Sequence, residues 1–228
     1  MTYQYYLRFN PTFKMKKSIV YFFFVFSFSM AQAQTQEGLY FNLGKNFSSF
    51  TYKNRSTLTT TLPINGVGEV YEIGYSMPLK YESYKIFKDF RYSGSVTLND
   101  YNAIAESAVN NLEWKTTYLG FQNTVDYQFY DAFHFFLSAK AGLNFSTLIS
   151  GKQIINTSVY NLVGQSEFSG LVLQPVVGIY AKYYLSKNGY LSLGCNLTKT
   201  IKMGNNSDNV SINTTQILFG GYFDLIKI

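Results

Sequence analysis

The sequence predicts an all-β fold, an eight-stranded antiparallel up-and-down transmembrane β-barrel. Three observations predict it: an N-terminal segment typical of an export signal, an unusual composition, and eight segments that alternate apolar and polar residues. The chain of 228 residues holds 21 Tyr, 21 Phe and 17 Gly, yet only 14% of its residues are charged. Barrels that cross a membrane spread their hydrophobicity over alternate positions. After residue 33 there is no apolar run of about 18 residues, so a membrane-spanning helix is not predicted.

The N-terminal segment has the three parts of a secretory signal. Lys16 and Lys17 form a basic stretch, residues 18–30 form an apolar run, and the Ala-Gln-Ala sequence at 31–33 supplies small residues at the cleavage positions. The apolar run is too short for a spanning helix, which needs roughly 20 residues. We therefore predict that residues 1–33 are a signal peptide.

The basic stretch also suggests where the natural start lies. Met15 immediately precedes it and is predicted to be the natural start, so residues 1–14 are predicted to be an extension that was wrongly assigned to the protein. Gln34 follows the predicted cut, and because it is not a Cys we expect no lipoprotein anchor. Residues 34–228 then form one outer-membrane β-barrel domain.

The net charge of the exported part is small. The predicted leader holds four of the chain's 19 basic residues and no acidic residue, which leaves 15 basic residues against 13 acidic ones. The formal charge of +6 for the whole chain thus falls to +2. The sequence has no cluster of Lys and Arg among aromatic residues, so we expect no nucleic-acid partner.

The first four predicted strands are 38–48, 68–78, 88–98 and 115–129, each with an apolar and a polar face as expected of period-two alternation. Their apolar faces hold Leu39, Phe41, Leu43 and Phe47; Tyr71, Ile73, Tyr75 and Met77; Phe90, Tyr92, Val96 and Leu98; and Leu119, Phe121, Val125, Tyr127 and Phe129. The opposite faces carry mainly Gly, Ser, Thr, Asn, Gln and a few charges.

The last four predicted strands alternate more regularly and occupy 133–146, 171–185, 189–201 and 214–225. Their apolar faces hold Phe133, Phe135, Leu137, Ala139, Ala141, Leu143 and Phe145; Leu171, Leu173, Val177, Ile179, Ala181, Tyr183 and Leu185; Leu191, Leu193, Cys195, Leu197 and Ile201; and Ile217, Phe219, Gly221, Phe223 and Leu225. A tilted spanning strand needs roughly 9–11 residues, which these segments supply.

The predicted links alternate between short and long. The short ones lie near 79–87, 130–132 and 186–189, and the last is a good hairpin turn. The long ones lie near 49–67, 99–114, 147–168 and 202–212 and are rich in Asn, Ser, Thr and Gly. Short turns at one rim and long loops at the other are typical of an outer-membrane barrel. An even strand number lets the first and last strands pair, which removes the unpaired edge.

Several stretches resemble a known family. Residues 114–121 (WKTTYLGF), 126–129 (DYQF), 139–142 (AKAG) and 219–223 (FGGYF) are similar to the central hairpin and the terminal strand of outer-membrane β-barrel domain proteins from Bacteroidota, the PorT-like porin-family group. The resemblance covers most of the mature chain. It implies a location in the outer membrane and a barrel fold far more than any activity.

The polar faces carry six charged residues that we expect inside the barrel: Glu72, Arg91, Asp126, Lys140, Lys182 and Asp224. The lumen of an eight-stranded barrel is only wide enough to be filled by side chains. Charges buried there must be paired to offset their loss of hydration. We predict a structural salt-bridge network in the lumen, and the alternative is a proton or ion path.

The sequence offers little for catalysis or metal binding. His134, its single histidine, is near Ser138 and Asp131, the residue types of an acyl-transfer site, but it lies in a predicted turn where a polar residue needs no special reason. Cys195 is the single cysteine, and its parity predicts a small lipid-facing side chain. We therefore predict no enzyme activity, no cofactor and no metal site.

The aromatic excess predicts girdles at the two membrane interfaces. The residues expected there are Tyr40, Phe47, Tyr71, Tyr127, Phe129, Tyr183, Tyr190 and Phe223. We expect a monomer surrounded by outer-membrane lipid, with a structural role or an unknown protein partner at its long outer loops. The alternatives are a soluble lipocalin-like barrel whose apolar face lines a ligand cavity, an aromatic sugar- or peptide-binding surface on the loops, and an accessory component of a secretion machine.

Overall fold

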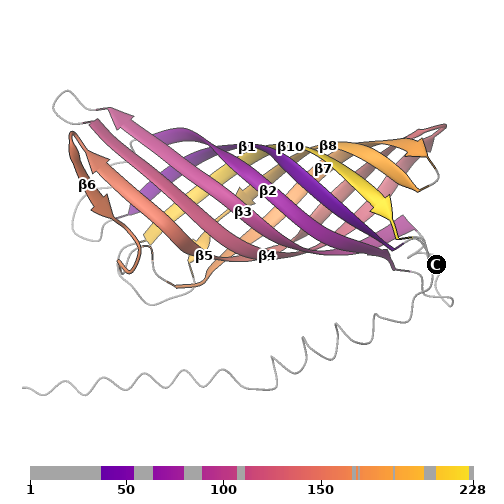
Figure 1. Ribbon diagram of the computed structural model, residues 1–228, viewed down its shortest axis with the longest axis horizontal. Coiled ribbons are helices and arrows are strands. Elements are labelled where there is room, and N and C mark those ends of the chain that lie inside the picture. Colours follow the sequence, from indigo (N-terminus) through magenta and orange to yellow (C-terminus); the bar gives the residue numbers. More distant parts are fainter. Residues whose placement is uncertain are drawn as a thin grey trace, which may run out of the picture. The chain divides into compact units, whose positions relative to one another are not determined.

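The computed structural model consists almost entirely of β-strands (Figure 1). It describes residues 37–53, 64–79, 89–106, 111–165, 168, 170–186, 188–202 and 209–225. The predicted signal peptide, residues 1–33, lies outside these residues. In the described part of the chain, no helix has the length and apolar character needed to span a bilayer.

Eight long strands form the barrel. They are β1 (Gly38–Lys53), β2 (Ile64–Pro78), β3 (Phe90–Glu106), β4 (Asn111–Ala132), β5 (Phe135–Ile155), β7 (Val172–Ser186), β8 (Gly189–Lys199) and β10 (Asn209–Asp224). Two short strands, β6 (Ser158–Asn161) and β9 (Ile201–Lys202), pair with β5 and β7.

The barrel is closed, as the sequence predicts. Each long strand pairs antiparallel with the next along the chain, and β1 pairs with β10 over its whole length, from Gly38 opposite Asp224 to Lys53 opposite Asn209. The pairing of β5 with β7 completes the ring. Closure gives the backbone N–H and C=O groups of the first and last strands their partners, which an open sheet leaves unsatisfied.

The two rims of the barrel differ. The turn end is the rim with the turn between β4 and β5, the turn between β7 and β8, and the start of β1 and the end of β10. The loop end is the opposite rim, where β6 lies and where β3 ends and β4 begins (Figure 1). The turn predicted at 186–189 joins Ser186 to Gly189, as expected. The short link predicted at 130–132 is a turn at Phe133 and His134, slightly later than expected. Most of the one predicted at 79–87 lies outside the described residues.

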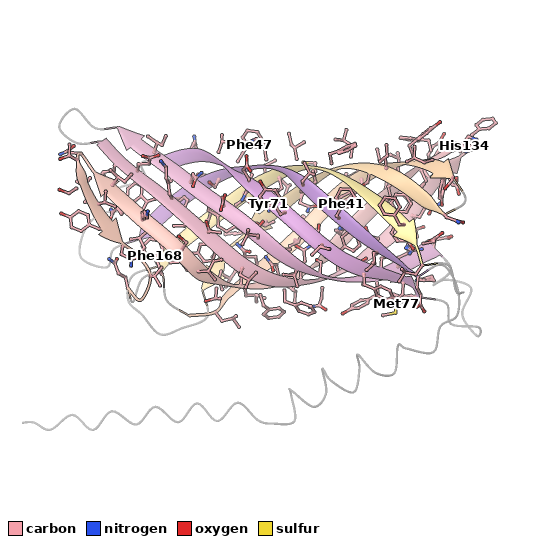
Figure 2. The ribbon with its side chains drawn as sticks, viewed as in Figure 1. Phe41, Phe47, Tyr71, Met77, His134 and Phe168 are labelled. Carbon is pink, nitrogen blue, oxygen red and sulfur yellow. The ribbon has the colours of Figure 1, made fainter. Side chains whose placement is uncertain are left out.

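The alternating faces point as their composition suggests. Among the described residues, 25 polar or charged side chains are buried, whereas large apolar side chains such as Ile73, Ile179 and Leu193 are more than half exposed on the outer wall. Figure 2 shows Phe41, Phe47 and Tyr71 projecting from the outside of the barrel. The lumen is therefore polar over most of its length and the outer wall is apolar.

Two predicted loops are wrong. Most of 99–114 is strand, because β3 continues to Glu106 and β4 begins at Asn111. Much of 147–168 is also strand, because β5 continues to Ile155 and β6 pairs back on it. Period-two alternation persists in these segments, but the faces exchange polarity: Tyr101 and Ala103 point inward and are buried. The strands were predicted from an apolar outer face, so the predicted strands end where this exchange occurs.

Candidate functional site

The lumen gathers the charged residues that the sequence singled out. Glu72, Asp126, Lys140 and Lys182 are buried, with 4 to 6% of each residue exposed. Arg91 and Asp224 are half-buried and lie in the turn-end parts of β3 and β10. All six residues lie in the turn-end half or the middle of the barrel. Each is on the inward face of its strand.

Glu72 is held by hydrogen bonds rather than by a salt bridge. Its Oε1 accepts hydrogen bonds from the hydroxyls of Tyr40 at 2.9 Å and Ser95 at 2.8 Å and from Nε2 of Gln122 at 2.9 Å, and its Oε2 accepts one from Nδ2 of Asn42 at 2.8 Å. These donors come from β1, β3 and β4, so one carboxylate on β2 links four strands. Four donors satisfy a buried carboxylate without an opposite charge.

Asp126, Lys140 and Lys182 form the charged layer of the lumen. Asp126 on β4 lies directly opposite Lys140 on β5 in the strand register. Its Oδ1 is 3.7 Å from Nζ of Lys182 on β7, which is an ion pair but too long for a direct hydrogen bond. Nζ of Lys140 lies 4.4 Å from the ring centroid of Tyr180 and 5.5 Å from that of Tyr40. Aromatic faces attract such cations.

Aromatic rings close the turn end of the lumen. The rings of Tyr190 and Tyr222 stack with centroids 4.5 Å apart, and Phe136 lies edge-on to Tyr190 at 5.3 Å. Arg91 donates a hydrogen bond from Nη2 to the Tyr222 hydroxyl at 2.6 Å. The charged layer is therefore covered by rings on this side.

Two tyrosines contradict the predicted girdle. Tyr40 is 8% exposed and bonds to Glu72, and Tyr190 stacks in the lumen, so neither faces outward. The reason is parity: Tyr40 shares its face with Asn42, and Tyr190 shares its face with Ser192, both of which point inward. The other six predicted girdle residues are all exposed: Phe47, Tyr71, Tyr127, Phe129, Tyr183 and Phe223.

Glycines make room for the inward tyrosines. A Cβ added at Gly194 would overlap the ring of Tyr180, and one added at Gly74 would lie 2.6 Å from Cζ of Tyr40. Each ring thus packs flat against the backbone of a neighbouring strand. This close approach brings both rings under the Lys140 ammonium.

Amide and hydroxyl side chains fill the middle of the lumen. Gln174 is 1% exposed and exchanges hydrogen bonds with the Tyr101 hydroxyl, donates to Thr200 at 3.1 Å, and accepts from Asn144 at 2.9 Å. Gln216 donates to Oδ1 of Asn99 at 3.0 Å. Neutral groups of this kind hydrogen-bond across the barrel without a net charge to compensate.

An apolar plug fills the lumen at the loop end. Its buried members are Phe50, Tyr101, Ala103, Tyr118, Leu162, Phe168, Val172 and Ile212, with Trp114 and Leu148 packed against them. Leu162 and Phe168 come from the segment between β5 and β7 rather than from a barrel strand. Strand parity indicates the inward position of plug residues such as Tyr101 and Tyr118, but it gives no information about Leu162 and Phe168.

A small cavity lies in the charged layer. Its volume is about 20 Å³, and Asp126, Lys140, Lys182, Tyr180 and Tyr190 are among the residues that line it. A space of this size holds about one water molecule. The lumen around it is filled with side chains, as expected for eight strands.

The residues considered for catalysis do not converge. His134 is exposed in the turn between β4 and β5, whereas Ser138 is 1% exposed inside the barrel. Asp131 is exposed and accepts a hydrogen bond from Gln128. Cys195 lies on the outer wall, as its parity predicts. In the described part of the chain, no three His, Cys, Asp or Glu side chains are grouped so that they could hold a metal ion.

Comparisons with known proteins give structural likenesses at low identity. No protein-family model matches the chain, and no curated protein matches it. Neisserial surface protein A aligns with a TM-score of 0.48 and 11% identity over 82% of this chain and 97% of its own. The attachment invasion locus protein Ail of Yersinia pestis aligns with a TM-score of 0.41 and 12% identity, covering 82% and 99%. The N-terminal barrel domain of Pseudomonas aeruginosa OprF gives 0.38 and 11%, covering 81% and 97%.

Proposed function

We propose that this chain is an outer-membrane β-barrel protein that spans the bilayer as a monomer with a filled lumen. It catalyses no reaction and presents its loop end to a partner outside the cell. The observation that carries the proposal is the apolar outer wall: in the middle and turn-end sections of the long strands, the side chains that point away from the barrel are mainly large and apolar. In water such a wall would be an exposed apolar patch far larger than soluble monomers carry.

The exchange of polarity along the strands supports a membrane boundary. Toward the turn end, β3 buries Ser93 and Ser95 and exposes Val96. Toward the loop end the same strand buries Tyr101, and Asp100 on the outer face accepts a hydrogen bond from Thr117 of β4. An outer wall that changes from apolar to polar matches a change of surroundings from lipid to water.

The lipocalin-like alternative requires the opposite arrangement. A soluble ligand-binding barrel lines its cavity with apolar residues and exposes polar ones. Here the inward face of the middle of the barrel holds residues such as Asn144, Gln174 and Gln216. This orientation argues against a soluble carrier of apolar ligands. The filled lumen likewise argues against a diffusion channel.

One substitution on the outer wall can test whether that wall faces lipid. Ile179 is 61% exposed on β7, so in a water-soluble barrel Ile179→Arg would change stability very little. In a bilayer we expect a loss of about 2–4 kcal/mol, because arginine on the lipid face is costly near the midplane. The measurement is urea unfolding in lipid vesicles, followed by the heat-dependent shift of the folded band on a gel.

Val163→Arg is the matched control. Val163 is also exposed, at 47%, but belongs to the loop end, so we expect the unfolding midpoint of the wild type. Equal stability of the two arginine variants, together with recovery of the chain in a soluble periplasmic extract, would refute the membrane proposal.

The outward direction of the loop end needs a separate test. In a Cys195→Ala background, a cysteine introduced at Tyr160 of β6 should react with a membrane-impermeant maleimide in intact cells. A cysteine introduced at His134 should react only after the outer membrane is permeabilised. Both side chains are exposed, so accessibility in the folded barrel does not limit either reaction. The reverse labelling pattern would place the loop end inside the cell.

A further inference from the structure

The turn between β4 and β5 carries a phenylalanine in a backbone conformation that favours glycine or asparagine. Phe133 has a φ of 54°, in the left-handed region, where a bulky side chain is rare because its Cβ crowds the backbone. Its ring is 102% exposed and therefore packs against no other part of the protein. Neither the geometry of the turn nor the packing of the barrel accounts for this residue, which points to a contact outside the chain.

Exposed aromatic side chains surround this turn. A register shift between Gln128 and Tyr130 leaves two successive aromatic residues exposed, Phe129 at 48% and Tyr130 at 51%. Phe135 begins β5, and Tyr183 of β7 pairs with it. We define the tip patch as the set of these exposed rings: Phe129, Tyr130, Phe133, Phe135 and Tyr183. Figure 2 shows His134, the other residue of the turn, at the turn end of the barrel.

The tip patch continues the apolar outer wall. At the turn end this wall stays apolar up to the rim, where Leu39, Leu185 and Leu225 are exposed. At the loop end it becomes polar, for example at Lys115. The rim of the turn end has no comparable polar margin, so the wall and the tip patch form one apolar surface.

The length of the wall places the turn at the surface of the bilayer. On β4 the mainly apolar outward stretch runs from Leu119 to Phe129, a difference of ten positions. At a rise of about 3.3 Å per residue and a tilt of about 40°, it covers about 25 Å along the barrel axis, the height of the apolar band of a membrane barrel. Phe133 lies two positions outside Phe135 and thus about 5 Å beyond the band. That depth corresponds to the headgroup layer, which is roughly 5–7 Å thick on each side of the hydrocarbon core.

We propose that the tip patch binds the surface of the leaflet at the turn end, with the ring of Phe133 inserted between the lipid headgroups and the upper part of the acyl chains. The inference rests on the proposed membrane location and names the contact that this turn makes there. Lipid supplies the apolar contact that the protein does not, and this gain offsets the cost of the left-handed backbone. Asp131 and His134 are exposed beside the ring, at the level where polar groups remain solvated. The β4–β5 turn is then an anchor that fixes the depth of the barrel in the membrane.

Depth-dependent fluorescence quenching tests the position of the ring. Trp114→Phe removes the single tryptophan of the chain, and Phe133→Trp is then folded into vesicles whose phospholipids carry bromine either near the headgroup or near the end of the acyl chains. The indole at position 133 should be quenched more strongly by the shallow bromine. In the same background, Ile179→Trp on the wall should be quenched more strongly by the deep bromine, and Val163→Trp at the loop end by neither.

The two possible failures of this experiment differ. Quenching at position 179 without quenching at position 133 would overturn the anchor and leave the membrane location standing. Absence of quenching at position 179 would refute the membrane location and the anchor with it.

Two substitutions of the same residue measure what the lipid contact contributes. Phe133→Leu and Phe133→Gln are similar in size and both keep a Cβ in the left-handed position, so the backbone cost is shared. Only leucine gains from leaving water, so urea unfolding in vesicles should give Phe133→Leu a folding equilibrium constant several-fold larger than that of Phe133→Gln. The matched control is the same pair at Val163, where the two constants should agree because that side chain is exposed at the loop end. Equal constants for the two Phe133 variants would overturn the proposal.

Discussion

The two ends of the lumen are built on opposite principles although the same strands form both. Toward the turn end the interior is a charged layer around Asp126, Lys140 and Lys182, and the outer wall is apolar. At the loop end the interior is the apolar plug, with Tyr101 and Leu162 at 1% and 0% exposure. The contrast indicates that the surroundings, rather than the strand pairing, decide which side chains each section of a barrel encloses.

Substitutions at the two ends should also lower the stability of the barrel for different reasons. The charged layer is stabilised by mutual compensation, so removing one partner leaves the others buried and uncompensated. The apolar plug is stabilised by packing and exclusion of water, so a truncation leaves a cavity and costs less per site when neighbours relax. Substitutions of matched size at the two ends measure this difference.

Asp126→Asn is expected to give the largest effect. It keeps the shape of the side chain but leaves Lys140 and Lys182 without the carboxylate that faces them. Breaking a buried pair in this way costs about 3–5 kcal/mol. The control is Glu113→Gln, which removes the outer partner of Lys115 and should cost less than about 1 kcal/mol. Urea unfolding of the two variants in the same detergent gives both values.

Leu162→Ala tests the apolar plug and is expected to give the second largest effect. Leu162 is fully buried although it belongs to the segment after β6. Truncation of a buried leucine costs about 2–5 kcal/mol, and the lower part of this range applies where the surroundings can relax, as a segment outside the strands can. Val163→Ala, at an exposed neighbour, is the control and should change stability by less than about 0.5 kcal/mol. Unfolding midpoints that agree for the two variants would show that the plug does not stabilise the barrel.

Much of the barrel was predictable because parity depends on local sequence alone. The side of each strand on which Asp126, Lys140 and Lys182 lie follows from counting alternate positions. The same count places Tyr40 with Asn42, so its inward position was available from the sequence. The prediction that Tyr40 belongs to a girdle followed the tyrosine content of the chain rather than this count, and the structure contradicts that prediction.

Which inward residues meet was not predictable, because it depends on register. Asp126 faces Lys140 only because β4 and β5 contain an irregularity between Gln128 and Tyr130 that shifts their pairing. A one-residue slip changes every cross-strand partner, and alternation within one strand carries no information about it. The plug was missed for another reason: Leu162 and Phe168 follow no strand pattern, and their burial depends on where the chain returns over the lumen.

The smallest expected effect tests how the charged layer is shaped. Gly194→Ala would push a Cβ into the ring of Tyr180, which lies under the Lys140 ammonium. Overpacking of this kind costs about 1–3 kcal/mol, because a buried ring must leave its place. Gly94→Ala is the matched control: the nearest atom to its added Cβ is Cζ of Phe121 at 3.9 Å, so stability should stay the same or rise slightly. Urea midpoints in detergent compare the two. A lower midpoint for Gly194→Ala alone would mean that the ring position set by one glycine contributes to the charged layer, whereas equal midpoints would show that Tyr180 can move without disturbing Lys140.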